Sequence, residues 1–229
     1  MSGSITAGSE SDASKKPLLL FIEGPKGAGK STLVDNLCKL LVSGITEEHV
    51  TVERFRHARS APEVFADPIA RNLSFASQRA LFCAGLRGRT GPSIVVCDRW
   101  NHSAIAAAEY LFDTNDGMRE AYILSTVEAE RRSTGDWMNG DLSGRRLSLI
   151  LSRSEGDLQS IAEAREVPRT AEDKHAADWY RRYDPKPYDH GPMHKLNVDL
   201  YSPAALAAIA AQYALDAAGI THFINMEPR

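Results

Sequence analysis

The segment from Gly24 to Ser31 constrains the fold of this chain more than any other part of the sequence. It reads Gly-Pro-Lys-Gly-Ala-Gly-Lys-Ser and fits the pattern G-x-x-x-x-G-K-[ST]. An apolar run precedes it at residues 18–22, and leucines at helical spacing follow it over residues 31–42. A short, fully apolar run is typical of a strand buried on both faces of a parallel sheet. The sequence therefore predicts a glycine-rich turn between a buried strand and a helix, which is the context that gives this pattern its meaning.

Such a turn is suited to binding a polyphosphate. Glycines allow backbone N–H groups to curl around phosphate oxygens, and the N-terminus of the helix adds its positive end. We expect Lys30 to be an exposed loop cation that reaches the β- and γ-phosphates, and the Ser31 hydroxyl to bind Mg²⁺. The predicted cofactors are ATP and Mg²⁺, and the residues predicted to bind them are Gly24, Gly27, Ala28, Gly29, Lys30, Ser31 and Thr32. A tight turn without a ligand is the alternative, and the flanking strand and helix argue against it.

The rest of the chain continues the alternation of strands and helices. Further strands are predicted at residues 50–55, 94–97, 147–151 and 195–198. Helices are predicted at residues 31–42, 73–85, 103–111, 118–132 and 157–165, around Trp179-Tyr180, and from Ser202-Pro203 to Gly219. Strands that alternate with helices form parallel sheets with right-handed crossovers. We therefore expect an α/β protein with the P-loop NTPase fold, in which helices flank a five-stranded parallel sheet.

Composition narrows the class of protein. Of the 229 residues 43% are apolar and 25% are charged, and the formal net charge is −3. These values exclude collagen-like, coiled-coil and disordered chains. The near balance of 27 basic and 30 acidic residues argues against a surface built wholly for nucleic acid. No apolar stretch is long enough to span a membrane.

Residues 1–16 are rich in Ser, Gly and Ala and lack an apolar run. We expect a disordered tail there, followed by one domain over residues 17–229. The three cysteines, Cys38, Cys83 and Cys97, lie far apart and are odd in number. This pattern indicates reduced core thiols rather than disulfides, so we expect a cytoplasmic protein.

The strand predicted at residues 94–97 leads directly into Asp98 and Arg99. Ligands of open α/β folds gather at the carboxyl ends of the strands. Asp98 is therefore a candidate to hold Mg²⁺ together with Ser31, directly or through water, and Arg99 would face the phosphate of an acceptor. The alternative is an ion pair between two neighbours that have no part in a site.

Four segments together resemble thymidylate kinases in their order and spacing, over about residues 18–218. They are FIEGPKGAGKST, Arg54-Phe55, Phe75-Ala-Ser-Gln-Arg79, and Asp98-Arg99-Trp100 followed by Ser103. The resemblance implies a P-loop kinase that transfers a phosphoryl group from ATP to a nucleotide. It also implies that the acceptor is bound by Arg54, Phe75, Arg79, Arg99 and Ser103, and we expect the charge of Lys26 to contact the acceptor phosphate as well.

Phe75 and Arg79 are four residues apart and so share one face of the predicted helix. A ring that stacks on a base and an arginine that hydrogen-bonds its edge would form a nucleobase pocket. The alternative places Phe75 in the core and Arg79 at the surface. From Glu53 to Arg99 there are eight arginines and four acids, and this local positive excess would attract a dianionic acceptor.

Residues 165–182 stand where such kinases carry a short mobile lid. Arg165 and Arg169 are candidates to close on the transferred phosphoryl group, and with Lys30, Asp98 and Arg99 we assign Arg169 a catalytic role. The competing interpretation is a solvated helix with paired charges. His190 and His194 lack the neighbouring ligands of a zinc site.

Two positions depart from the thymidylate kinase pattern. The third position of the loop is usually Asp in that family and is Lys26 here. The helix after Asp98-Arg99 often offers a Tyr toward the sugar, and the matching position here is Ala107, with Tyr110 one turn away. The acceptor is therefore expected to be thymidylate, a modified pyrimidine nucleotide or another small acceptor.

Three functions remain open at this stage. The first is a (deoxy)nucleoside monophosphate kinase, whose acceptor is already an oxyanion and needs no general base. The second is a kinase for a hydroxyl of a nucleoside or modified base, DNA included, which needs a carboxylate base such as Asp98, Glu53, Glu63 or Asp67. The third is a nucleotide-binding relative without activity, against which the intact Lys30, Ser31, Asp98 and Arg99 argue. The absence of an N-K-x-D motif argues against a GTPase. The expected partner is a small-molecule nucleotide, and nucleic acid would be a substrate only under the second function. A homodimer is compatible with the sequence.

Overall fold

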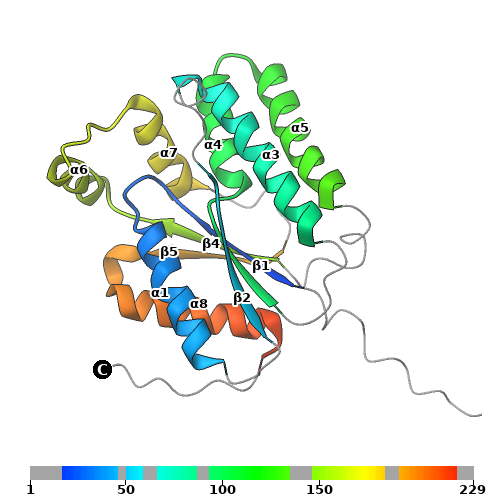
Figure 1. Ribbon diagram of the computed structural model, residues 1–229. Coiled ribbons are helices and arrows are strands. Elements are labelled where there is room, and N and C mark those ends of the chain that lie inside the picture. The colour runs from blue at the N-terminus through cyan, green and yellow to red at the C-terminus, as the bar shows by residue number, and fades with distance from the viewer. Residues whose placement is uncertain are drawn as a thin grey trace, which may run out of the picture.

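Five parallel strands form one sheet in the spatial order β2-β3-β1-β4-β5. The strands are β1 (Leu18–Glu23), β2 (Thr51–Arg56), β3 (Ser93–Asp98), β4 (Arg146–Ser152) and β5 (Met193–Asn197). The helices are α1 (Lys30–Gly44), α3 (Pro68–Leu86), α4 (Asn101–Leu111), α5 (Asp116–Thr134), α6 (Glu155–Ala164), α7 (Ala171–Arg182) and α8 (Pro203–Ala218), with the short 3₁₀ helix η4 (Val198–Leu200). The computed structural model describes residues 17–45, 50–58, 66–86, 93–134, 146–183 and 191–220. The predicted α/β fold with a five-stranded parallel sheet is confirmed (Figure 1).

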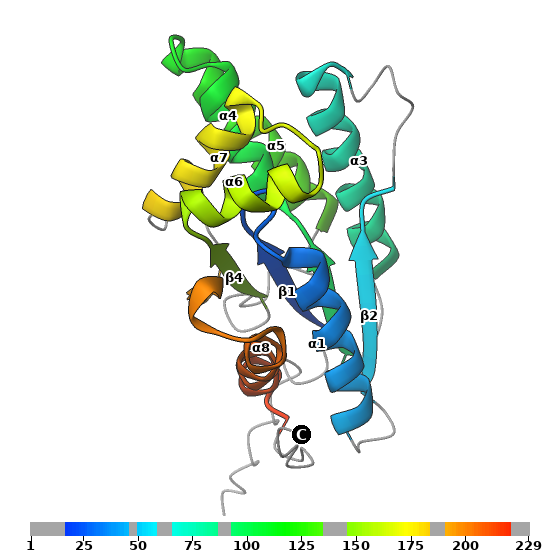
Figure 2. The same cartoon turned by 90° about the vertical axis from the view of Figure 1, so that its left-hand side faces the viewer.

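Helices cover both faces of the sheet. In Figures 1 and 2, α1 and α8 lie on one side of the strands and α3, α4 and α5 lie on the other. Strand β1 contributes side chains to the core on both faces of the sheet, because successive side chains of a strand point in opposite directions. Leu18, Leu20 and Ile22 pack with α1 and α8, whereas Leu19 and Phe21 pack toward α3. All six residues of β1 are buried, as the apolar run predicts.

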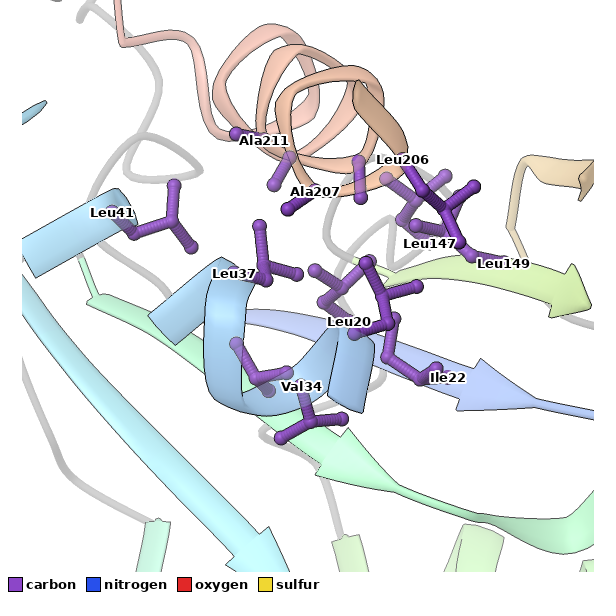
Figure 3. Packing of buried hydrophobic residues seen from close by; sticks show 14 of the residues in the cluster. Leu20, Ile22, Val34, Leu37, Leu41, Leu147, Leu149, Leu206, Ala207 and Ala211 are labelled. Carbon is purple, nitrogen blue, oxygen red and sulfur yellow. The ribbon is translucent and has the colours of Figure 1, made fainter. Parts of the chain in front are cut away.

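The core beneath α1 and α8 is built mainly from Leu, Val, Ile and Ala side chains. Figure 3 shows Val34, Leu37 and Leu41 of α1 in one cluster with Leu20 of β1 and with Leu206, Ala207 and Ala211 of α8. Alanines of α8 let that helix approach α1 closely, because Ala adds little bulk beyond the backbone. This packing holds the first turn of α1, and therefore the loop before it, against the sheet.

The predicted helix boundaries hold with two corrections. Helix α3 begins at Pro68, five residues before the predicted start at Leu73. Asp67 accounts for the earlier start, because its side chain accepts a hydrogen bond from the Ala70 N–H at 2.7 Å and a proline is favoured in the first helical turn. The first helix, predicted to end at residue 42, continues to Gly44. At α8 the predicted start at Ser202-Pro203 and the predicted end at Gly219 are both confirmed, since Ser202 is the N-cap and Gly219 is the C-cap.

The three cysteines are free thiols. Cys83 and Cys97 are fully buried, and Cys38 is partly buried against the core. Within the described residues, no helix combines the length and apolar character needed to cross a membrane. The tail predicted at residues 1–16 lies outside the described residues.

Candidate active site

The loop between β1 and α1 has the backbone conformation that the glycine pattern predicts. Gly24, Gly27 and Gly29 have φ values of 147°, 89° and 84°, in the region that side chains disfavour. At Gly24 a Cβ atom would also lie 2.6 Å from the carbonyl oxygen of Leu151. Any other residue at Gly24 would therefore push the loop away from β4.

Helix α1 presents free backbone donors to this loop. Its N-cap is Gly29, which makes no side-chain capping bond. The N–H groups of a first helical turn have no partner within the helix and attract anions. The loop and the helix terminus together fit a polyphosphate group.

Lys30 is buried, which corrects the prediction of an exposed loop cation. Only 6% of the residue is exposed, and its ammonium group donates to the carbonyl oxygens of Gly24 at 2.8 Å and Pro25 at 2.5 Å. Burial, reinforced by the positive charge of Arg99, lowers the pKa of Lys30 well below its ordinary value, although Glu23 and Asp98 act in the opposite direction. A phosphate at this position would restore the favourable environment of the ammonium ion.

Ser31 and Asp98 meet as predicted for a magnesium site. The Ser31 hydroxyl donates to a carboxylate oxygen of Asp98 at 3.1 Å, from the first turn of α1 to the end of β3. A hydroxyl and a carboxylate supply oxygen ligands of the kind Mg²⁺ prefers, and Mg²⁺ commonly takes its other ligands from phosphates and water. These two residues therefore fit Mg²⁺ bound with a nucleotide. No cluster of three or more His, Cys, Asp or Glu side chains suited to a metal occurs in the part of the chain that the structure describes.

Arg54 and Ala28 lie beside this site without lining the cavity described below. Arg54 pairs with Asp35 of α1, and its second nitrogen lies 3.9 Å from Asp98. The Ala28 side chain is fully buried in the core under α1 and α8, and its N–H donates to the Pro25 carbonyl at 3.2 Å. Their predicted contacts with substrate and nucleotide stay predictions.

Arg99 has an unusual backbone conformation for a residue other than glycine. Its φ is 72°, and its N–H donates to the Ile22 carbonyl at 3.0 Å. Such conformations cost energy and cluster at functional sites. The Arg99 guanidinium lies 3.5 Å from the Ser103 hydroxyl, so these two predicted acceptor residues are neighbours.

A single cavity of about 610 Å³ joins the phosphate-binding loop to the helix that carries Phe75 and Arg79. Cations outnumber acids among its lining residues. The cations are Lys26, Lys30, Arg56, Arg71, Arg79, Arg99 and Arg165, and the acids are Asp98, Glu172 and Asp173. The seven cations against three acids give a formal excess of +4, which favours an anionic ligand. The cavity also contains the predicted residues Gly24, Gly27, Gly29, Ser31, Thr32, Phe75 and Ser103.

The alternative for Phe75 and Arg79, a core ring and a surface cation, is wrong. Arg79 is 1% exposed, and its guanidinium carbon lies 5.8 Å from the ring centre of Trp100. Phe75 is half-buried and lines the cavity rather than joining the hydrophobic core. Both residues are therefore available to one ligand in the same cavity.

Glu23 is a site residue that the sequence analysis missed. It is fully buried at the end of β1 and accepts hydrogen bonds from the Trp100 N–H at 2.6 Å, the Ser103 hydroxyl at 2.8 Å and the Tyr180 hydroxyl at 2.9 Å. Burial raises the pKa of Glu23, but the hydrogen bond and charge of His102 and the bonds from Ser103 and Trp100 outweigh it and lower the pKa to about 2. The only signal in the sequence is an acid at the end of an otherwise apolar strand.

The segment predicted as a lid places two acids over the cavity. At the first turn of α7, Glu172 pairs with Arg71 of α3 at 2.5 Å and Asp173 pairs with Lys26 of the loop at 3.3 Å. Arg165 lines the cavity. Arg169 does not, because its guanidinium is held by the Glu155 carboxylate and by the Asp173 carbonyl. The catalytic role of Arg169 stays a prediction.

The remaining candidates are placed as follows. Ala107 lines the cavity, whereas Tyr110 is 36% exposed, contacts His175 and does not line it. Tyr110, one turn after Ala107, therefore does not take the place of the family's tyrosine in this cavity. His194 stacks on Tyr213 with ring centres 3.9 Å apart. His190 and Glu63 lie outside the described residues. The polar and charged residues that line the cavity and that the sequence analysis missed are Arg56, His57, Arg71, Asn72, Thr170, Glu172, Asp173 and Tyr180.

Comparison with known proteins identifies the fold. No protein-family model matches the sequence, and no curated protein matches it by sequence. The structure is similar to that of a thymidylate kinase from Candida albicans, with a TM-score of 0.52 and 15% identity over 93% of this chain and 96% of that chain. It also matches the YorR protein of Bacillus subtilis, solved in complex with phosphorylated GDP, with a TM-score of 0.48 and 13% identity over 86% of this chain and 96% of that one. The similarity to the thymidylate kinase structure shows that the chain has the predicted P-loop NTPase fold.

Proposed function

We propose that this protein transfers the γ-phosphoryl group of ATP to a (deoxy)nucleoside monophosphate, with thymidylate or a modified pyrimidine nucleotide as the leading acceptor. The observation that carries the proposal is the single cavity, which has a phosphate-binding loop at one end and the pair Phe75 and Arg79 at the other. Two nucleotides that meet end to end in such a cavity place the donor phosphates next to the acceptor phosphate. The excess of lining cations fits the combined charge of two nucleotides.

Each residue of the loop region has a definite part in this reaction. Lys30 would hold the β- and γ-phosphates, and Ser31 and Asp98 would hold Mg²⁺, which neutralises charge that develops on the phosphates. Arg99 would bind the acceptor phosphate and keep it in line with the γ-phosphate. Catalysis by positioning and charge stabilisation requires no proton-accepting side chain.

A hydroxyl acceptor fits the cavity less well, because such a reaction needs a carboxylate base. The acids that line the cavity in the described part of the chain are already engaged. Asp98 accepts from Ser31, Glu172 pairs with Arg71, and Asp173 pairs with Lys26. Glu23 accepts three hydrogen bonds and its pKa of about 2 makes it a weak base.

The test is an acceptor screen with ATP and Mg²⁺ in which ADP release is measured. The acceptors are the nucleoside monophosphates, the nucleosides and single- and double-stranded DNA. We expect turnover with one or more pyrimidine monophosphates and none with nucleosides or DNA. Turnover with nucleosides or DNA alone would replace the proposal with the hydroxyl kinase, and tight ATP binding without turnover would indicate a relative that only binds nucleotide.

A further inference from the structure

His57 lies in the acceptor end of the cavity, just after the last residue of β2. Its ring centre lies 5.0 Å from that of Phe55 and 4.6 Å from that of Phe75. The imidazole is half-buried and lines the cavity. It is therefore held between strand β2 and helix α3, next to the ring that we propose as the stacking surface for the base.

Two polar neighbours define how the ring is protonated. Nε2 of His57 lies 3.4 Å from a guanidinium nitrogen of Arg79, and the ring is hydrogen-bonded to the backbone of Asp98. Because a guanidinium can only donate, Nε2 has to be the acceptor and Nδ1 has to carry the hydrogen. One neutral tautomer thus satisfies both neighbours at once.

Burial and the positive charge of Arg79 disfavour protonation of the His57 ring. Burial, with the adjacent positive charge of Arg79, lowers the pKa of His57 from 6.5 to about 4. Arg99 acts in the same direction, whereas Glu23 and the bond to Asp98 act in the opposite one. A protonated ring would lose its acceptor nitrogen and would repel Arg79.

Arg79 gains a fixed orientation from these contacts. Its long side chain has several rotatable bonds, whose freedom is costly to remove when a ligand binds. In the structure one guanidinium nitrogen faces His57 while the guanidinium carbon lies over Trp100. The guanidinium plane is therefore set before any acceptor arrives.

We propose that His57 is a positioning residue of the acceptor site, which accepts a hydrogen bond from Arg79 and ties that arginine to the Asp98 end of β3. Asp98 belongs to the proposed magnesium site, so His57 sets the distance between the acceptor base and the reacting phosphates. This inference rests on the proposed function. It requires that His57 act through Arg79 and not by touching the acceptor.

Two variants separate the hydrogen bond from the ring. His57→Phe keeps an aromatic ring against Phe75 and removes both hydrogen bonds, whereas His57→Gln loses the ring and keeps an acceptor that can reach Arg79. We expect His57→Phe to raise the acceptor KM about 10-fold or more, the loss expected for a hydrogen bond to a charged group. We expect His57→Gln to stay within about 3-fold of the wild type, and the KM for ATP to stay unchanged in both. Equal acceptor KM values for the two variants, after melting curves have shown that both fold, would overturn the proposal.

A double-mutant cycle tests whether His57 acts through Arg79. If it does, His57→Phe has no further effect on the acceptor KM once Arg79→Met is present, because contacting residues are not additive. If the two effects add, His57 contacts the acceptor by itself and is not a positioning residue.

Imidazole NMR supplies a measurement that does not depend on turnover. In ¹⁵N-labelled wild-type protein at pH 7 we expect the His57 ring, assigned by comparison with His57→Gln, to be the neutral Nδ1–H tautomer. Its Nε2 resonance should shift in Arg79→Met. A Nε2–H tautomer or a protonated ring would overturn the proposal even if the enzyme is active. Absence of transfer to every monophosphate alongside the expected spectrum would overturn the proposed function and leave the contact between His57 and Arg79 established.

Discussion

The ammonium group of Lys26 lies 3.3 Å from a carboxylate oxygen of Asp173, although the two residues are 147 positions apart in the chain. The pair joins the phosphate-binding loop to the first turn of α7. Asp173 also forms a capping box with Thr170 at the start of this helix. Burial raises the pKa of Asp173, but the Thr170 backbone bond and the Lys26 charge outweigh it and lower the pKa. Lys26, the departure from the thymidylate kinase pattern, thus has a partner on the segment predicted as a lid.

Reversing the two charges tests this pair. Lys26→Asp sets two carboxylates against each other and should raise the KM for both nucleotides, whereas in the Asp173→Lys background the same change restores attraction and should lower it. Because half of the Lys26 side chain is exposed, we expect effects of about 2- to 5-fold. Steady-state kinetics of the wild type, the two single variants and the double variant measure these effects. An identical effect of Lys26→Asp in both backgrounds would show that Lys26 acts as a solvated side chain.

Lys30→Met should abolish most transfer and leave the fold intact. Met keeps much of the buried aliphatic volume of Lys30 and removes the charge that would hold the phosphates. Loss of one such donor from a preorganised site costs about 10²- to 10³-fold in kcat. Lys39→Met, at an exposed position on the same helix, is the matched control and should keep full activity. Initial rates and melting temperatures check both variants. A Lys30→Met enzyme with wild-type rates would contradict the assignment of the loop before α1 as the phosphate-binding loop.

The succession of strands and helices along the chain and the loop before α1 follow from local pattern, so the sequence could predict them. An apolar run, three glycines and a leucine stripe each act over a few residues. The burial of Lys30 could not be predicted in this way, because it depends on how the carbonyls of Gly24 and Pro25 fold back over the ammonium group.

Polar contacts between residues far apart in the chain are the other feature of the candidate site that the sequence pattern could not reveal. Glu23 and Tyr180 are 157 positions apart, and no periodicity connects them. The side of α3 that faces the cavity was predicted from the spacing of Phe75 and Arg79. His57 could not be predicted in this way, because it follows the end of a strand, where the direction of a side chain depends on the next turn. Contacts between two residues that are far apart in the sequence can be identified only once the fold is known.

Asp98→Asn should weaken the binding of Mg²⁺ and lower kcat. The amide keeps the shape of the carboxylate and can still accept from Ser31, but it removes the negative charge that would bind the metal. We expect a fall of about 100-fold or more and a higher Mg²⁺ concentration at half-maximal rate. Asp35→Asn is the control, since Asp35 also pairs with Arg54 but is half exposed on α1. The activity of both variants is measured as a function of Mg²⁺ concentration. Equal curves for Asp98→Asn and Asp35→Asn would show that Asp98 is not part of the metal site.

Tyr180→Phe should destabilise the protein. The change removes one of three short hydrogen bonds to the buried carboxylate of Glu23, and leaving a buried acceptor short of a donor costs about 1–3 kcal/mol. Tyr110→Phe, at a partly exposed position of α4, should change the free energy of unfolding by less than about 0.5 kcal/mol. Urea unfolding at pH 7 measures both. Equal stabilities would show that the bond from Tyr180 contributes nothing.

Acid should destabilise the protein in two successive ranges of pH. The pKa of His57 is about 4 in the folded chain against an ordinary value of 6.5, so between these values the unfolded chain binds a proton that the folded chain does not. The pKa of Glu23 is about 2 against 4.5, which has the same consequence at lower pH. In each range the free energy of unfolding therefore falls with falling pH, by at most about 1.4 kcal/mol per pH unit for each group.

His57→Gln isolates the first of these ranges, because it removes one titrating group and leaves the carboxylates in place. The difference in unfolding free energy between wild type and variant should be constant above pH 6.5 and should change between pH 6.5 and 4, as the stability that the wild type owes to a neutral His57 is lost. His194→Gln, at the ring stacked on Tyr213, is the control for loss of a histidine elsewhere. Urea unfolding at half-unit steps of pH supplies the curves. A difference that stays flat down to pH 4 would show that folding does not shift the pKa of His57.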